Sequence, residues 1–340
     1  MHYLITGHTG FKGSWLSLML QMQGHIVSGI SLDPLDKSLF NKAGLTEIFE
    51  NDLRIDIRNS KELAQAIKKI QPEVIIHLAA QPLVRESYKD PVGTFETNVL
   101  GTLNLLEATK GLKSLKATLI ITTDKVYKNH NHYRGYVETD ELGGNDPYSA
   151  SKAAADIATQ SWVKSFATTP VAVARAGNVI GGGDWAADRI IPDLVDAYSS
   201  NQLPTLRYPD AIRPWQHVLD CLNGYQKLVN NMLSNGASGE WNFGPSLDDK
   251  HSVAELVEAF AKSWGIKGDQ QVWKAERVEQ PHEAGYLLLD SSKAREILGW
   301  SEKLNYENAI GMTVNWFKEI ETRNPRAVTT KQIRDFLELS

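Results

Sequence analysis

Residues 2–13 read HYLITGHTGFKG, and this stretch decides the fold. Its apolar start predicts a β-strand, and Gly7, Gly10 and Gly13 follow with the spacing G-x-x-G-x-x-G. A helical pattern, GSWLSLMLQMQG, begins at Gly13 and closes at Gly24. Glycines at such a junction let the backbone turn tightly and approach a pyrophosphate, which meets the positive end of the helix. The stretch predicts the first βα unit of a dinucleotide-binding fold; a tight turn without a ligand is the alternative.

Strands and helices alternate through the first half of the chain. Further strands are predicted over 25–32, 73–80, 116–123 and 170–176, and helices over 60–70, 98–110 and 148–166. Ser60 is the expected N-cap of its helix, with Glu62 in the first turn. Continuous apolar strands joined by helices predict a parallel sheet covered on both faces. The fold class is therefore α/β, a doubly wound Rossmann-type sheet with ligands at the carboxyl ends of its strands.

After Gly177 the pattern changes, and Gly, Pro and Trp become frequent in GGGDW, YPDAIRPWQHV and WNFGP. This composition predicts a smaller, irregular α/β domain that supplies a substrate pocket. The segment WNFG is expected to return to the first sheet. The dinucleotide-binding domain is accordingly predicted over 1–176 and about 215–244, and the smaller domain over about 177–214 and 245–340.

The bulk numbers exclude several classes of protein. The chain has 340 residues, 42% hydrophobic and 23% charged, with a net charge of -5 and no block of like charge, so nucleic-acid and membrane partners have little support. No apolar run approaches the roughly 20 residues that span a bilayer, no signal peptide is evident, and the single cysteine, Cys221, fits a reducing cytoplasm. His130 and His132 lack companion ligands, so we expect a polar loop there and no metal.

Asp33 follows the second predicted strand, about twenty residues after the glycine turn. A carboxylate there bonds an adenosine ribose and disfavours a 2′-phosphate, which favours NAD over NADP. A turn residue before Pro34 is the alternative.

Tyr148 and Lys152, in PYSASK, lie four residues apart and share one face of a predicted helix. The ammonium is expected to lower the phenol pKa toward neutrality, which makes the tyrosine a base for a hydroxyl proton. Asp124 and Lys125 follow the strand TLIITT. They are either a solvated strand end or an acid and a base for one substrate. The second interpretation requires that the strand has already ended, because adjacent strand residues point to opposite faces. It also requires a lysine pKa lowered by a dry pocket.

These segments resemble the extended short-chain dehydrogenase/reductase superfamily, on GHTGFKG, HLAAQ, ETNVLGTLNLLEA and YSASK. More narrowly, TGHTGFKGSWLSLML, RAGNVIGGGDW, IRPWQHVL and PHEAGYLLLD resemble the CDP-glucose 4,6-dehydratases. The resemblance covers nearly the whole chain. It implies a cytoplasmic, homodimeric or homotetrameric NAD-dependent lyase that converts CDP-D-glucose to CDP-4-dehydro-6-deoxy-D-glucose. Such a product serves deoxysugar biosynthesis for the lipopolysaccharide O-antigen.

The resemblance also implies roles for five catalytic residues. Tyr148, supported by Lys152, takes the proton of the sugar 4-hydroxyl while NAD takes the C4 hydride. Thr123 hydrogen-bonds the 4-oxygen. Lys125 then removes the C5 proton, Asp124 protonates the departing 6-hydroxyl, and the hydride returns to C6. An epimerase or a simple reductase needs no such extra pair.

Binding residues follow from the same matching segments. Those expected to bind NAD, besides Tyr148 and Lys152, are Gly7, Thr9, Gly10, Phe11, Lys12, Gly13, Asp33, Asp56, Ile57, Leu78, Ala79, Ala80, Asn98 and Thr122. Arg213 is the first choice for the substrate diphosphate, because a guanidinium fork matches phosphate oxygens. The other expected substrate residues are Gln81, Asn178, Arg189, Tyr208, His217, Asn242 and His282. Trp185, Tyr208 and Trp215 either stack on a pyrimidine or fill the core.

Three alternatives remain open at this stage. The chain could act on another nucleotide-activated hexose, invert C5 during dehydration, or bind a nucleotide sugar without catalysis. The base of the nucleotide rests on the resemblance alone. Helices beginning near Asn98 and Tyr148 carry apolar faces that fit a dimer interface.

Overall fold

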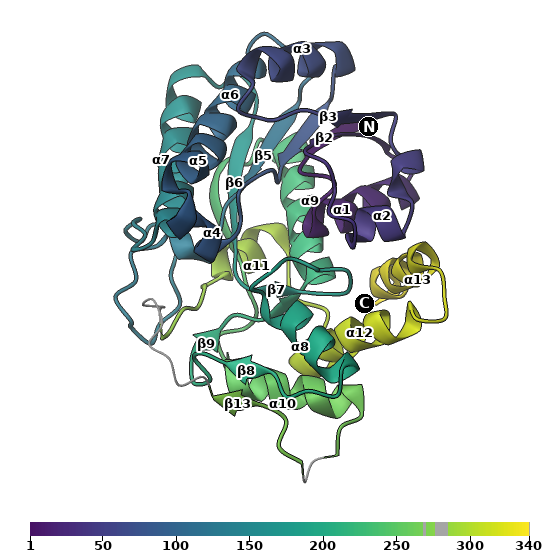
Figure 1. Ribbon diagram of the computed structural model, residues 1–340. Helices are drawn as coiled ribbons and strands as arrows, with labels where there is room; N and C mark the ends of the chain where they lie inside the picture. The colour runs from purple at the N-terminus through teal and green to yellow at the C-terminus, as the bar shows by residue number, and fades with distance from the viewer. Residues whose placement is uncertain (268–269, 276–284, 340) are drawn as a thin grey trace.

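The computed structural model describes residues 1–267, 270–275 and 285–339. Its centre is a seven-stranded sheet in the order β11-β6-β5-β4-β1-β2-β3, and all neighbouring strands are parallel (Figure 1). The predicted α/β doubly wound class is therefore confirmed. The strands are β1 (His2–Thr6), β2 (Ile26–Ser31), β3 (Asn51–Arg54), β4 (Val74–His77), β5 (Ala117–Ile121), β6 (Val171–Ala176) and β11 (Gly239–Phe243).

Helices cover both faces of this sheet, because alternate strand residues point to opposite sides. Ile5 of β1 belongs to a core shared with α1 (Phe11–Met22) and α9 (Val218–Asn235). The preceding Leu4 belongs to a second core. The helices α3 (Ser60–Ile70), α6 (Gly101–Ala108) and α7 (Pro147–Phe166) pack there.

Some local predictions need correction. The N-cap of α3 is Asn59, not Ser60, because the Asn59 side chain accepts the backbone N–H of Glu62. The edge strand β3 was not predicted, since its sequence NDLR is only partly buried and has no apolar run. The short helices α4 (Val84–Lys89) and α5 (Pro91–Phe95) were not predicted, and the helix predicted over 98–110 begins within the π-helical turn η2 (Glu96–Leu100).

Apart from β6, α9 and β11, the second half of the chain forms mostly short strands and helices below the sheet in Figure 1. The segment WNFG does return to the sheet, since β11 pairs with β6. Helix α13 packs against α1 and α2, so the end of the chain contacts the first half. The remaining elements are α2 (Leu39–Lys42), η1 (Leu45–Ile48), η3 (Asp124–Val126), β7 (Val179–Ile180), α8 (Ile190–Ser199), β8 (Thr205–Leu206), β9 (Ile212–Arg213), β10 (Gln216–His217), β12 (His251–Ser252), α10 (Val253–Trp264), β13 (Lys274–Ala275), α11 (Ser292–Leu298), α12 (Tyr306–Glu319) and α13 (Pro325–Glu338).

The strand order changes direction between β1 and β4. The chain runs outward from β1 to β3 on one side and from β4 to β11 on the other, so the loops after β1 and β4 diverge there. Such a switch point leaves a crevice at the carboxyl ends of the strands. The glycine turn, the segment after β4 and the TTDK segment after β5 all lie at this edge.

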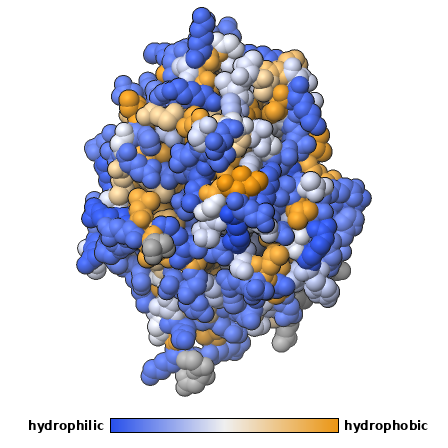
Figure 2. Space-filling model, turned by 180° about the vertical axis from the view of Figure 1, so that it is seen from behind, coloured by the Kyte–Doolittle hydropathy of each residue, from blue (hydrophilic) through white to orange (hydrophobic). Residues whose placement is uncertain are grey.

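The face seen in Figure 2 is mostly hydrophilic, and its hydrophobic side chains form separate patches. In the part of the chain that the structure describes, no helix has the length and hydropathy of a membrane span.

Candidate active site

Two of the three glycines in the turn are required by the local geometry. Gly7 has a φ of +73°, and a Cβ there would lie 2.7 Å from the backbone nitrogen of Ala79. A Cβ at Gly13 would lie 2.2 Å from the carbonyl oxygen of Gly7. The turn therefore packs directly against the segment that follows β4, as a close-packed phosphate-binding turn requires.

The third glycine, Gly10, lies at the start of α1 with more space around it than the other two. A Cβ there would meet only the Gly7 carbonyl oxygen, at 3.3 Å. Gly10 is the N-cap of α1, and no side chain caps the helix. The first N–H groups of the helix thus remain available to an anion beside a backbone that a ligand can approach closely. This arrangement fits the diphosphate of a dinucleotide.

The other predicted residues of the turn connect it to neighbouring elements. The Thr9 hydroxyl lies 2.7 Å from the Ser31 hydroxyl at the end of β2. Phe11 is partly buried against the first core. The Lys12 ammonium donates to the phenol oxygen of Tyr225 at 3.3 Å.

Asp33 lies just beyond β2 with 90% of its side chain exposed, where a ribose hydroxyl can reach it. The Nε of Arg54, at the end of β3, is 3.4 Å from its carboxylate. Asp56 pairs with Arg58, whose hydrogen bonds hold the pKa of Asp56 below its usual value. The Ile57 side chain is buried in the second core, so only its backbone is suited to a cofactor contact.

The segment after β4 is partly exposed at Leu78, Ala79 and Ala80. Asn98 is 1% exposed, and its amide bonds the backbone of Gln81 and the hydroxyl of Ser151. The Gln81 side chain in turn bonds Leu83 and Thr94. Both amides therefore hold the loop shape in this structure.

Strand β5 ends at Ile121, before the TTDK segment. Asp124 and Lys125 therefore lie beyond the strand, as their interpretation as an acid and a base requires. Thr123 is the N-cap of the short turn η3, and its side chain accepts the N–H of Lys125. The Thr123 hydroxyl donates to Oδ1 of Asp124 at 2.9 Å. Asp124 is 2% exposed, and its Oδ2 has no hydrogen-bond partner among the described residues. Burial raises the pKa of Asp124, which favours a protonated carboxyl that can act as an acid.

Tyr148 and Lys152 lie in the first turns of α7, which begins after the N-cap Asp146. Burial raises the pKa of Tyr148 to about 12, although a hydrogen bond with Thr123 opposes the shift. The expectation of a phenol pKa near neutrality is therefore wrong for the protein by itself, because desolvation outweighs the hydrogen bond with Thr123 and the charge of Arg189. Burial, with the charge of Lys12, lowers the pKa of Lys152 to about 8.

Two predicted substrate arginines lie close to this centre. Arg213 is 3% exposed, and its charge acts on the carboxyl of Asp124. Arg189 donates to Asp184 at 3.0 Å, and its charge acts on Tyr148. Asn178 and Tyr208 are partly exposed.

Two other predicted substrate residues form hydrogen bonds within the fold. His217 and Asn242 are fully buried. His217 caps α9, whereas Asn242 bonds Tyr127 and the carbonyls of Tyr136 and Asp290. His282 lies outside the described residues.

The two tryptophans considered for stacking on the base pack within the protein instead. Trp185 packs edge-on against Phe317, and Trp215 is 6% exposed and bonds the carbonyl of His251. The described residues contain no cluster of side chains suited to a metal ion.

The sequence analysis missed a buried ion pair beside the site. Asp156 of α7 and Arg175 of β6 are both fully buried and joined at 2.8 Å. Their signal was present, since each is a charged residue inside an apolar element, in KAAAD and VAVARA.

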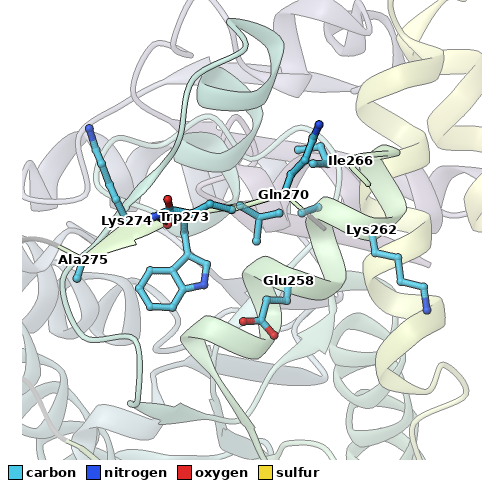
Figure 3. A pocket seen from close by; sticks show the side chains of 10 residues that line it. Glu258, Lys262, Ile266, Gln270, Trp273, Lys274 and Ala275 are labelled. Carbon is cyan, nitrogen blue, oxygen red and sulfur yellow. Dashed lines mark hydrogen bonds between the residues drawn. The ribbon is translucent and has the colours of Figure 1, made fainter. Parts of the chain in front are cut away.

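A pocket of about 530 Å³ lies elsewhere, in the second half of the chain (Figure 3). Side chains of α10 and of the segment around β13, among them Glu258, Lys262 and Trp273, line it. None of the predicted site residues lines this pocket. The candidate active site is therefore assigned to the residues at the carboxyl ends of β1, β4 and β5.

Comparisons with known proteins agree with this geometry. The family model described as GDP-mannose 4,6 dehydratase matches residues 4–313. A CDP-glucose 4,6-dehydratase of Salmonella typhimurium is 42% identical over 345 residues, which cover 98% of this chain and 95% of that protein. A dTDP-glucose 4,6-dehydratase of Neisseria gonorrhoeae is 28% identical, over 95% of this chain and 97% of that protein.

Solved structures show the same fold. A dTDP-glucose 4,6-dehydratase of Bacillus anthracis in complex with NAD has a TM-score of 0.80 at 23% identity, over 97% of this chain and 99% of that chain. A UDP-glucose 4-epimerase of Thermotoga maritima has a TM-score of 0.81 at 21% identity, over 94% and 99%.

Proposed function

Because this chain belongs to the GDP-mannose 4,6 dehydratase family, we propose that it is an NAD-dependent nucleotide-sugar 4,6-dehydratase, a hydro-lyase acting on CDP-glucose. The proposed product is CDP-4-dehydro-6-deoxy-D-glucose. The observation that carries the proposal is the convergence of Asp124, Thr123 and Tyr148 at the end of β5. A buried carboxyl beside the tyrosine is the additional acid that dehydration requires. The similarity to the Salmonella enzyme supports the choice of CDP-glucose.

The open start of α1 and the exposed Asp33 support the binding of NAD by its diphosphate and ribose. When bound, the nicotinamide would accept a hydride in its oxidised form and return it in its reduced form, and the oxidised ring would add a positive charge to the site. Gly10 leaves room for the diphosphate, while Gly7 and Gly13 allow the close packing of the turn.

Tyr148 accepts the proton of the sugar 4-hydroxyl. Because burial raises its pKa to about 12, the phenol of the protein alone is protonated at neutral pH, and added positive charge must lower that pKa before Tyr148 can act as a base. Lys152 lies one turn away on α7 and supplies part of that charge. Thr123 bonds the phenol and is placed to bond the 4-oxygen as well.

The elimination step belongs to Asp124 and Lys125. Lys125 removes the C5 proton, which the 4-ketone acidifies, and the electron pair forms the C5–C6 double bond. Asp124 gives its proton to the departing 6-hydroxyl, which leaves as water. Its raised pKa and its unpartnered Oδ2 support this role.

Arg213 and Arg189 are proposed to bind the substrate diphosphate, with Asn178 and Tyr208 at the edge of the pocket. Their location near Asp124 and Tyr148 supports this assignment. A role for His282 remains a prediction, as does the division into two domains.

We also propose a homodimer, or a tetramer built from such dimers. Val92, Phe95, Leu100, Ile157 and Phe166 expose apolar side chains on α5, η2 and α7. Sedimentation of the wild-type protein and of Leu100→Glu/Ile157→Glu tests this interface. The single cysteine, Cys221, is buried and free, which supports a cytoplasmic location. That the product serves deoxysugar synthesis for the O-antigen rests on resemblance alone.

The test is to incubate the purified protein with NAD and, separately, with CDP-glucose, dTDP-glucose, UDP-glucose and GDP-mannose. CDP-glucose should be turned over fastest, measured by the ultraviolet absorbance that 4-keto-6-deoxy sugars develop in alkali. Faster turnover of another hexose would reassign the nucleotide. A product with inverted C5 would indicate the C5-inverting reaction, and binding of the sugar without turnover would indicate a non-catalytic relative.

A further inference from the structure

The segment that carries Thr123, Asp124 and Lys125 is bordered by two hydroxyl side chains. At its start, the Thr122 hydroxyl donates to Oδ2 of Asp156 at 3.2 Å. At its end, the Tyr127 hydroxyl accepts from the guanidinium of Arg175 at 2.9 Å. The two ends of a six-residue segment therefore reach the same buried ion pair.

That ion pair is rigidly held. The Nε and Nη2 of Arg175 donate to the two carboxylate oxygens of Asp156, each at 2.8 Å, in a bidentate arrangement. The Nη1 of Arg175 also donates to the carbonyl of Glu138 at 2.9 Å. Burial alone would lower the pKa of Arg175, but the hydrogen bonds and charge of Asp156 raise it. Arg175 thus stays charged, and the bidentate contact with Asp156 has a fixed geometry.

The same pair belongs to the helix that carries the tyrosine. Asp156 lies four residues after Lys152 on α7, one helical turn further along. Lys152 donates to the carbonyl of Ile121 at 3.1 Å, just before Thr122. The ion pair therefore links the helix of Tyr148 and Lys152 to both ends of the segment of Asp124 and Lys125.

We propose that Asp156 and Arg175 are positioning residues, which hold the acid and base of the elimination step at a fixed distance from the tyrosine of the oxidation step. The proposal rests on the proposed dehydratase function. The same bound sugar must react first with Tyr148 and Lys152 and then with Asp124 and Lys125. The distance between these two sets of side chains must therefore stay fixed. A displacement of about 1 Å can cost on the order of a hundredfold in rate.

Stability alone is a weak reason for this arrangement. Burying two charges costs free energy that their attraction often only repays, and apolar replacements of similar volume are frequently neutral. A role in placing other groups accounts better for a pair whose spare donors and acceptors all go to the ends of one segment, to Glu138 and to Gln160.

Removing the ion pair itself risks unfolding, so the test removes one anchoring hydroxyl at a time. The test variants are Tyr127→Phe and Thr122→Val. Tyr136→Phe is the matched control for the first, because Tyr136 stacks on Tyr127 at 5.1 Å but bonds Asn129 instead of the pair. Thr118→Val is the control for the second, because Thr118 lies on β5, the strand that ends just before Thr122, and its buried hydroxyl has no partner among the described residues.

The first measurement is hydrogen–deuterium exchange of the backbone amides of residues 123–127, with no substrate present. Exchange should be about tenfold faster in Tyr127→Phe and Thr122→Val, because each releases one end of the segment. Both controls should match the wild type. Unchanged protection in both test variants would overturn the proposal, and this readout does not depend on which reaction the protein catalyses.

The second measurement is steady-state turnover of CDP-glucose. We expect kcat to fall about ten- to a hundredfold in the two test variants, with KM within about twofold of wild type in both and NAD affinity within about twofold in Tyr127→Phe. An equal loss in the controls, or a loss that follows the folded fraction, would mean a purely structural role. A wild-type protein inactive on every nucleotide hexose would refute the dehydratase function instead, and the exchange data would still decide the anchoring.

Discussion

The ammonium of Lys152 donates a hydrogen bond to the backbone carbonyl of Ile121 at 3.1 Å. This contact joins helix α7 to the last residue of β5, directly before the TTDK segment. Lys152 is only 7% exposed, and burial together with Lys12 lowers its pKa to about 8. At neutral pH the folded protein therefore buries a positive charge, and this burial lowers the free energy of unfolding.

Lys152→Met should reveal this cost as a pH dependence. Between about pH 8 and the ordinary lysine pKa of 10.5, the unfolded chain binds a proton that the folded protein has lost. Wild-type stability should therefore rise with pH across this window relative to Lys152→Met, by up to about 3 kcal/mol. Urea denaturation from pH 7 to 10.5 measures it. Lys128→Met, an exposed lysine paired with Glu141, should show no such rise. Parallel curves for wild type and Lys152→Met would contradict the buried charge.

Gly10→Val should abolish NAD binding without unfolding the protein. Gly10 has an ordinary φ of -77°, and an added Cβ would lie 3.3 Å from the Gly7 carbonyl oxygen, so the fold should accommodate it with a shift of a few tenths of an ångström. The valine methyls would occupy the space in front of α1 that the diphosphate needs. Isothermal titration with NAD is the measurement, with Gly311→Val as the control, because that glycine also has open space around it. Retained tight binding would refute the assignment of the turn.

Asp33→Asn should relax the preference for NAD. Arg54 approaches Asp33 with its Nε while its two terminal nitrogens bond Asp52. Without the carboxylate, a 2′-phosphate meets less repulsion and has a guanidinium beside it. The affinity for NADP relative to NAD should rise at least about tenfold, or 1.4 kcal/mol.

Two further variants isolate the contribution of Arg54. Asp33→Asn/Arg54→Met should lose most of the gain, whereas Asp36→Asn, the same change in the same loop, should leave the ratio unchanged. If Asp33→Asn leaves the ratio as in wild type, Asp33 is a turn residue, the alternative that the sequence left open.

The sequence predicted those parts of the molecule that rest on local patterns. The apolar strands predicted a parallel sheet, and the i,i+4 spacing placed Tyr148 and Lys152 on one face of α7. The acid-base interpretation of Asp124 and Lys125 required that the strand end before them, and both residues lie in the turn η3, beyond β5. Each of these depends on residues close together in the chain.

Features that depend on distant packing were not predicted. The pKa of Tyr148 is dominated by burial, which no spacing reveals. Asn242, assigned to the substrate by resemblance, bonds Tyr127, which is 115 residues away. The pairing of Asp156 with Arg175 likewise depends on the contact of a helix with a strand, although an isolated charge in each apolar element indicated a buried partner.

Tyr148→Phe should remove the base of the oxidation step and little else. The ring stays in its buried site, and only the hydroxyl that bonds Thr123 is lost. We expect kcat to fall about 10²- to 10⁴-fold, with CDP-glucose affinity within about threefold of wild type. Tyr198→Phe, whose hydroxyl bonds Val272 instead, is the control. Near-normal turnover in Tyr148→Phe would mean that another group accepts the proton.

Lys125→Met should separate the two halves of the reaction. The change keeps the side-chain length and removes the amine, so Tyr148 and Lys152 can still act at C4 while the C5 proton stays in place. Turnover should fall about 10²- to 10⁴-fold. Sugar recovered from D2O should carry no deuterium at C5, and a 4-ketohexose should accumulate that borodeuteride reduction traps at C4.

Asp124→Asn should give a different pattern, because it removes the acid and leaves the base. The Asn oxygen can still accept the hydrogen bond from Thr123, so the turn η3 should survive. Deuterium should enter C5 of the recovered sugar at a rate near that of wild type, while loss of the 6-hydroxyl slows by a comparable 10²- to 10⁴-fold, roughly. For Lys125→Met, the control is Lys128→Met, because Lys128 lies just beyond the turn η3 and its loss should leave turnover unchanged. If Lys125→Met exchanges C5 and turns over normally, Lys125 is a solvated residue at a strand end, and the base of the elimination must be sought elsewhere around Asp124.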